Sequence, residues 1–215
     1  MGGRGANSGG RPRGRGGVNP LNIVSTTSLV SEREGFRTEV DQTLTVARDV
    51  YQEYGISTDL EVATLKGKDA YGTMAYYDSN GNLAVNKNYF DAKTMNSAYD
   101  KCVESGFHPS RGNKSGMEAV VSHELGHRLT DEVAKRQGLK GYQLDKVADD
   151  IVKEASKKAG YGNAVVKFSG KISGYAKQSN AEAVAEAFAD VYCNGKKARK
   201  ESHAIVDVLN SYLKK

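Results

Sequence analysis

The sequence predicts an α+β fold, with a small sheet near the start of the chain and several helices after it. Apolar residues first recur at helical spacing, strand-like alternation follows over residues 59–90, and helical spacing returns after residue 115. A length of 215 residues suits one hydrophobic core. We therefore expect a single domain at residues 21–215, preceded by a tail at residues 1–20.

The tail carries the basic character of the chain, whose formal net charge is +5. It holds four arginines, no acid and many glycines, and this composition predicts disorder. One interpretation is a solvated linker, and the other is a segment that contacts nucleic-acid phosphates. Four arginines without interleaved aromatic residues disfavour contact with nucleic acid, so we expect no nucleic-acid partner.

The composition, and the lack of membrane and secretory signals in the given sequence, argue against several classes of protein. The hydrophobic content of 38% and charged content of 27% are typical of a soluble globular protein. No apolar run approaches the roughly 18 residues of a membrane helix, and "LNIVSTTSLV" is too short and too polar for a secretory signal. Two distant cysteines indicate no disulfide framework. We expect no membrane contact and a cytoplasmic or virion-associated protein.

The first predicted elements are one helix and one small sheet. The segment "SEREGFRTEVDQTLTVARDVYQEYG" begins with a capping box, Ser31 to Glu34, and keeps helical apolar spacing up to Gly55. Two strand-like runs then flank Asn80-Gly81, which is a strong hairpin signal. These runs predict a small antiparallel or mixed sheet at residues 59–90.

The second half of the chain is predicted to be mainly helical. Residues 91–114 are expected to be irregular, and a capping box from Ser115 to Glu118 begins a helix over residues 117–135. Further helices are predicted at "LDKVADDIVKEASKK", "SNAEAVAEAFADVY" and "SHAIVDVLNSYLKK". Between them, residues 160–178 are expected to be loop with one short strand.

The stretch "VVSHELGHRLT" contains the strongest chemical signal. His123 and His127 lie one helical turn apart, within about 40° of each other around the axis, so both imidazoles can reach one ion. His-Glu-x-x-His on a helix is typical of a Zn²⁺ site in which Glu124 is the general base. The alternative is a surface face with two solvated histidines. Gly126 weakens the helix by about 1 kcal/mol, which close approach of another backbone would justify.

A third metal ligand is predicted on the helix "SNAEAVAEAFADVY". Glu182, Glu186 and Asp190 follow one another at one-turn intervals with no accompanying lysine, which indicates a cation or a histidine partner. Glu182 has an alternative role as the partner of Ser179 in a capping box. If Glu182 binds metal, Glu186 can accept the second ring N–H of a ligand histidine, and Asp190 is the least favoured of the three.

Together these motifs resemble the gluzincin class of zinc metallopeptidases. "SGYAKQSNAEAVAEAFAD" is similar to the third-ligand segment of the anthrax lethal factor-like catalytic domain, and the likeness covers roughly residues 107–192. The resemblance implies a zincin-like domain in which His123, His127 and Glu182 bind zinc and Glu186 supports the site. It also implies Glu124 as the base and Tyr175 as the donor to the oxyanion. Ala181 departs from many gluzincins, which have a glutamate there.

A second resemblance concerns the setting of the protein. The Gly-Arg-Gly opening, with "GFHPS", "VVSHELGH" and "AEAFAD", is similar to zincin-like domains of phage head-associated proteins, which implies phage structural proteins as partners. The predicted function is zinc-dependent hydrolysis of peptide bonds in a protein or peptide substrate. The alternative is a catalytically silent, zinc-stabilised structural module of a phage particle, which Glu124 disfavours.

Three further predictions concern residues around the motif. Tyr175 has a structural alternative, because the chain holds twelve tyrosines. His108, in "FHPS", is predicted to be a loop histidine. The hairpin runs "NGNLAVNK" and "GTMAYY" are each a candidate for an edge strand that binds extended substrate by strand addition, with a purely structural hairpin as the alternative.

Overall fold

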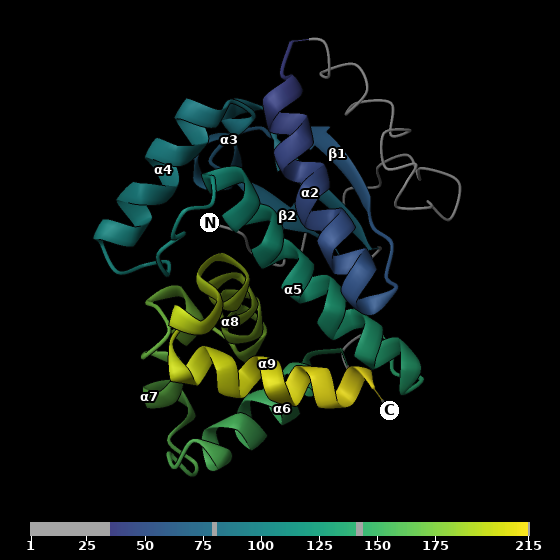
Figure 1. Ribbon diagram of the computed structural model, residues 1–215, viewed down its shortest axis with the longest axis vertical. Helices are drawn as coiled ribbons and strands as arrows, with labels where there is room; N and C mark the ends of the chain where they lie inside the picture. The colour runs from purple at the N-terminus through teal and green to yellow at the C-terminus, as the bar shows by residue number, and fades with distance from the viewer. Residues whose placement is uncertain (1–34, 79–80, 141–143, 215) are drawn as a thin grey trace. The chain divides into compact units, whose positions relative to one another are not determined.

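The structure, a computed structural model, describes residues 35–78, 81–140 and 144–214. It is an α+β protein with one three-stranded sheet among these residues, as predicted (Figure 1). The helices are α2 (Arg37–Tyr54), α3 (Asp69–Gly72), α4 (Ala92–Glu104), α5 (Gly116–Arg136), α6 (Leu144–Lys158), α7 (Val165–Ser169), α8 (Asn180–Asn194) and α9 (Lys200–Leu213). The strands are β1 (Asp59–Ala63), β2 (Ala75–Tyr77) and β3 (Asn82–Asn86), and short 3-10 turns include η4 (Tyr175–Lys177).

The internal contacts divide the chain into two compact units. The first contains the described residues up to Ser97 together with Ser115–Leu125, and the second contains Ala98–Lys114 and the described residues from Gly126 onward. Helix α5 contributes residues to both units. The expectation of a single domain at residues 21–215 stays a prediction, and the tail at residues 1–20 lies outside the described residues.

The first unit is built on a mixed sheet with the strand order β1-β3-β2. Strands β2 and β3 form the predicted antiparallel hairpin on either side of residues 79–80, with Ala75 opposite Val85. The sheet as a whole is mixed, which is one of the two predicted arrangements, because β1 pairs with β3 in parallel. The connection from β1 to β2 contains α3, which allows β1 to lie beside β3 and not beside β2. Strand β1 therefore runs parallel to β3, on the side of β3 opposite to β2.

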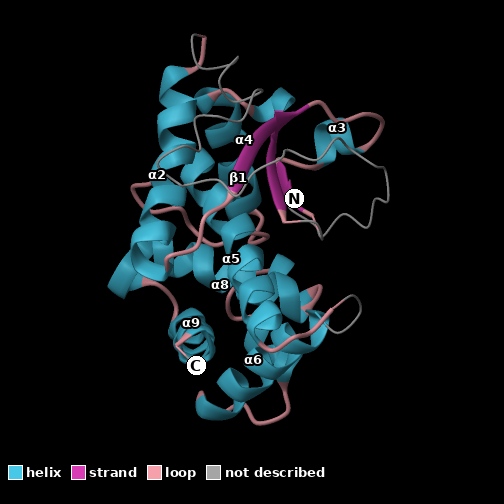
Figure 2. Cartoon of the chain, turned by 90° about the vertical axis from the view of Figure 1, so that its right-hand side faces the viewer, coloured by secondary structure: helices cyan, strands magenta, loops and turns pink. Residues whose placement is uncertain are grey.

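Helix α2 lies along one face of this sheet, on which Figure 1 and Figure 2 agree. Its apolar stripe of Val40, Leu44 and Ala47 is buried, as the helical spacing predicts. The helix begins at Arg37, and the predicted capping box at residues 31–34 lies outside the described residues. It ends as predicted at Gly55, whose φ of 68° is the left-handed conformation that glycine adopts readily.

Residues 91–114, predicted to be irregular, contain a helix. Helix α4 begins where the Asp91 carboxylate accepts a 2.8 Å hydrogen bond from the backbone N–H of Thr94, which is a side-chain cap. Met95 and Tyr99, one turn apart, are its buried residues. Two apolar anchors give too weak a periodicity to indicate a helix from sequence.

The described residues of the second unit form helices, turns and loops, with no strand among them. Helices α6, α8 and α9 pack on one another, and Val147, Ile151, Ile205 and Leu209 are among the residues they bury. Residues 160–178 contain α7 and η4, so the short strand expected there is wrong. None of the helices in the described part of the chain is long and apolar enough to cross a membrane.

The strand order also bears on the predicted substrate strand. The run "NGNLAVNK" forms β3, which is paired on both sides, so the expectation that it is an edge strand is wrong. Strand β2, from the run "GTMAYY", lies at one end of the strand order. Of the two runs, "GTMAYY" is the one that could still bind an extended substrate by strand addition, and this role stays a prediction.

Candidate metal centre

Helix α5 positions the two histidines. The predicted capping box forms at its start, where Ser115 N–H donates to the Glu118 carboxylate at 2.8 Å and Glu118 N–H donates to Ser115 Oγ at 3.1 Å. Because α5 is one continuous helix, its own geometry fixes the spacing of His123 and His127. Both rings are buried, so the alternative of a solvated polar face is wrong.

Helix α8 supplies a carboxylate to the same place. Ser179 caps the helix by accepting a 3.1 Å hydrogen bond from the backbone N–H of Glu182. The side chain of Glu182 is buried, and its Oε2 atom lies 3.4 Å from Nε2 of His127. The capping role of Ser179 therefore holds, while the Glu182 carboxylate lies against a histidine of α5.

These residues form a group that could hold a metal ion. His123, His127 and Glu182 each offer one ligand atom, and the three atoms lie within 4.8 Å of one another. All three residues are buried. The predicted ligand set is thus brought together, although Glu182 lies far along the chain from the two histidines.

Gly126 lets α5 and α8 approach closely. A Cβ atom at this position would lie 2.7 Å from the Cα of Ala185 and 3.2 Å from the Cβ of Phe188. Carbon atoms in contact are normally about 3.5–4.0 Å apart, so a side chain here would push the helices away from each other. The predicted reason for this glycine, close approach of another backbone, is confirmed.

Glu186 lies one turn after Glu182 and is also buried. One carboxylate oxygen lies 2.9 Å from Nδ1 of His108, and the other accepts a 2.6 Å hydrogen bond from Ser173 Oγ. Its predicted bond to a ligand histidine stays a prediction. His108 does lie in a loop, but sequence reasoning missed its contact with Glu186, which is 78 residues away.

Asp190, the third acid of α8, has a structural role. Its carboxylate accepts hydrogen bonds from Ser202 Oγ at 2.6 Å, Asn194 Nδ2 at 2.9 Å and the backbone N–H of Arg199 at 3.0 Å. These bonds join the end of α8 to the start of α9. The lower preference for Asp190 as a ligand agrees with this arrangement.

Tyr175 is buried in η4, four residues before the Ser179 cap of α8. Its ring centroid lies 4.9 Å from that of Phe107 and 5.4 Å from that of His108, the latter in an edge-on arrangement. Its backbone N–H donates to the Phe107 carbonyl at 3.0 Å. Its role as a catalytic donor stays a prediction.

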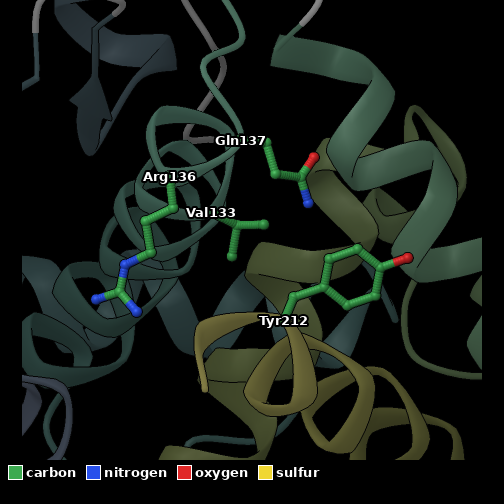
Figure 3. A pocket seen from close by; sticks show the side chains of 4 residues that line it. All are labelled: Val133, Arg136, Gln137 and Tyr212. Carbon is green, nitrogen blue, oxygen red and sulfur yellow. The ribbon is translucent and has the colours of Figure 1, made fainter. Parts of the chain in front are cut away.

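A pocket elsewhere in the second unit lacks the features of a binding site. It is lined by Val133, Arg136, Gln137 and Tyr212 (Figure 3). The Arg136 guanidinium and the Tyr212 hydroxyl point in different directions, so the polar groups do not converge on one point. The group of His123, His127 and Glu182 on α5 and α8 therefore remains the candidate functional site.

Comparison of the chain with protein-family models, curated proteins and solved structures finds no match. Any functional conclusion therefore depends on the residues of the site.

Proposed function

We propose that the protein is a zinc-dependent endopeptidase of the gluzincin kind. The observation that carries this proposal is Glu124, a carboxylate with 0% exposure directly after His123 on the metal-ligand helix. Glu124 therefore has the position that the general base has in a His-Glu-x-x-His site, which supports a chemical role. A purely structural metal site needs only its ligands, whereas hydrolysis also needs a base.

The ligand group supports zinc as the metal. Two imidazoles and one carboxylate are the ligands of catalytic zinc sites that leave the fourth position open. Ligands about 2.1 Å from a tetrahedral zinc lie about 3.4 Å from each other. The distance of 3.4 Å between His127 Nε2 and Glu182 Oε2 fits this spacing. It is longer than a usual N–H···O hydrogen bond of about 2.7–3.2 Å.

In the proposed mechanism, bound zinc would polarise the scissile carbonyl and make a water molecule acidic near neutral pH. Glu124 would accept the proton of the attacking water and then deliver it to the leaving amine. The hydroxyl of Tyr175 would donate a hydrogen bond to the developing oxyanion. His123, His127 and Glu182 would act as the metal ligands.

The proposed substrate is an extended protein or peptide segment. The sequence resemblance to phage head-associated domains supports phage structural proteins as partners. A silent structural module of a phage particle would have the same ligand group, so cleavage rather than zinc binding distinguishes the two functions.

The first test is the metal content of the purified protein, measured by mass spectrometry for wild type and three variants. We expect about one zinc per chain in wild type, because the three ligands form a single group. Glu182→Gln should lose most of this zinc, and Glu186→Gln should lose less. Glu132→Gln is the matched control, since Glu132 is on α5 and its carboxylate pairs with Arg128 and Arg136.

The second test is cleavage of a peptide library. Wild type should cleave, and Glu124→Gln should keep its zinc but lose activity by about 10²- to 10⁴-fold, the usual contribution of a general base. A wild type that binds no zinc contradicts the metal site. A wild type that binds zinc but cleaves nothing favours the structural module.

A further inference from the structure

The segment Gly106–His108 holds the turn that carries Tyr175. The carbonyl of Gly106 accepts the N–H of Gly174 at 2.8 Å, and the carbonyl of Phe107 accepts the N–H of Tyr175 at 3.0 Å. The fit is close, because a Cβ atom on Gly174 would lie 3.2 Å from the Gly106 oxygen. The backbone at the start of the turn is therefore held against this segment.

His108 links this segment to helix α8. Its Nδ1 atom lies 2.9 Å from Oε1 of Glu186, and both side chains are buried. With Glu186 ionised, its carboxylate only accepts hydrogen bonds, and Nδ1 of His108 is the donor. Its ring stacks on Tyr99, with centroids 5.2 Å apart and planes 5° from parallel. The stack and the hydrogen bond together restrict the orientation of the imidazole.

The other carboxylate oxygen of Glu186 restrains the same turn through Ser173. Ser173 Oγ donates to Oε2 of Glu186 at 2.6 Å, and it accepts the backbone N–H of Ala176 at 3.0 Å. Glu186 therefore connects His108 on one side with the residues around Tyr175 on the other. This is not a serine nucleophile with its base, because the glutamate lies between Ser173 and His108.

We propose that His108 is a positioning residue, whose hydrogen bond to Glu186 holds the turn that carries Tyr175 in place. The inference rests on the proposed function, since positioning matters only if Tyr175 donates to an oxyanion. A donor in an oxyanion site must be held before the reaction, because its value comes from needing no reorganisation. In this role His108 acts through the turn that carries Tyr175 and not on the substrate itself.

Two variants separate the hydrogen bond of His108 from its ring. His108→Phe keeps an aromatic ring against Tyr99 but cannot donate to Glu186. His108→Asn loses the ring but places an amide N–H near the position of Nδ1. If the bond to Glu186 is what holds the turn, the asparagine variant should resemble wild type and the phenylalanine variant should not.

The first measurement is steady-state kinetics of the full-length zinc-loaded protein on a peptide that wild type cleaves. We expect His108→Phe to lower kcat by about 10- to 100-fold, the range for residues that orient groups of a metal site. KM and zinc content should change little, because ground-state binding and the ligands are untouched. His108→Asn should recover most of kcat.

The second measurement needs no activity. Hydrogen exchange of the Gly174 and Tyr175 amides, followed by NMR on the full chain, should be about tenfold faster in His108→Phe. The amides of α6 serve as a reference for overall stability and should be unchanged. His108→Asn should exchange like wild type.

The outcomes separate the two proposals. If wild type is active and His108→Phe keeps its kcat and slow exchange, the positioning role is wrong and the peptidase stands. The same holds if His108→Asn is as impaired as His108→Phe, because restoring the donor to Glu186 then does not restore the turn. A wild type that binds zinc but cleaves no peptide overturns the proposed function, and this inference with it.

Discussion

Individual residues on α8 with the same charge have different partners. The carboxylate of Glu182 lies against His127, that of Glu186 lies between His108 and Ser173, and that of Asp190 joins α8 to α9. Each acid is buried, so each needs compensation by charge or by hydrogen bonds. Only Glu182 belongs to the group that could hold a metal ion.

Tyr99 provides a pH-dependent prediction at this scale. Burial, and next the negative charge of Glu186, hold the pKa of Tyr99 well above its ordinary value of 10.0. Its hydroxyl donates to the Pro109 carbonyl at 3.1 Å, and only the neutral form can do so. The folded state therefore retains this proton at a pH where the unfolded state loses it. The stabilisation is present below the ordinary pKa and is lost as pH rises toward the folded pKa.

We expect the free energy of unfolding of wild type to fall between about pH 9 and pH 11 more steeply than that of Tyr99→Phe, which lacks this ionisation. At neutral pH, the free energy of unfolding of Tyr99→Phe should be about 1 kcal/mol lower than that of wild type, which is the net contribution of one hydrogen bond. Urea unfolding across this pH range gives both quantities. Parallel pH profiles for the two proteins would contradict a raised pKa of Tyr99 in the folded state.

At the scale of elements, the crossing of α5 and α8 determines whether the ligands can meet. Each helix presents its own ligands by local geometry, but the distance between His127 and Glu182 depends on how closely the backbones approach. Gly126 sits at this crossing, opposite Ala185. The absence of a side chain at Gly126 therefore helps to form the candidate metal centre, although Gly126 offers no ligand.

Gly126→Ala should weaken zinc binding and lower the free energy of unfolding by about 1–3 kcal/mol, because the added methyl group overpacks the crossing. Gly72→Ala is the matched control, since Gly72 is also helical and an added Cβ would meet nothing within 4 Å. Zinc competition with a chelator and urea unfolding would measure the two effects. A Gly126→Ala protein with wild-type zinc affinity would show that the close approach is not needed.

At the scale of the whole molecule, metal binding should be linked to folding. The ligands come from helices far apart in the chain, so the unfolded chain cannot present them together. A ligand that binds only the folded state stabilises it by about 2.7 kcal/mol at a concentration one hundred times its dissociation constant. The loaded protein should therefore be more stable than the metal-free protein.

We expect a chelator to lower the free energy of unfolding of wild type, and added zinc to restore it. Glu182→Gln should respond little to either treatment, because it has lost one of the three ligands. Calorimetric melting with and without chelator would measure the shift. Equal melting temperatures for loaded and metal-free wild type would rule out this linkage.

The sequence alone predicted the features that depend on local geometry. The spacing of His123 and His127, the caps at Ser115 and Ser179, and the bounds of α6 all follow from interactions within about one helical turn. These features leave a periodic or a paired signal in the sequence. They were enough to indicate the two helices whose residues form the group that could hold a metal ion.

The tertiary structure decided the features whose contacts are distant in sequence. The parallel pairing of β1, the bond between His108 and Glu186, and the approach of Ala185 to Gly126 join segments that no local pattern relates. Helix α4 was missed for a related reason. It buries only Met95 and Tyr99, and two residues do not form an apolar stripe that the sequence would show. Sequence determines which groups a helix can present, because that depends on turns of about four residues. Packing between helices determines which of those groups meet.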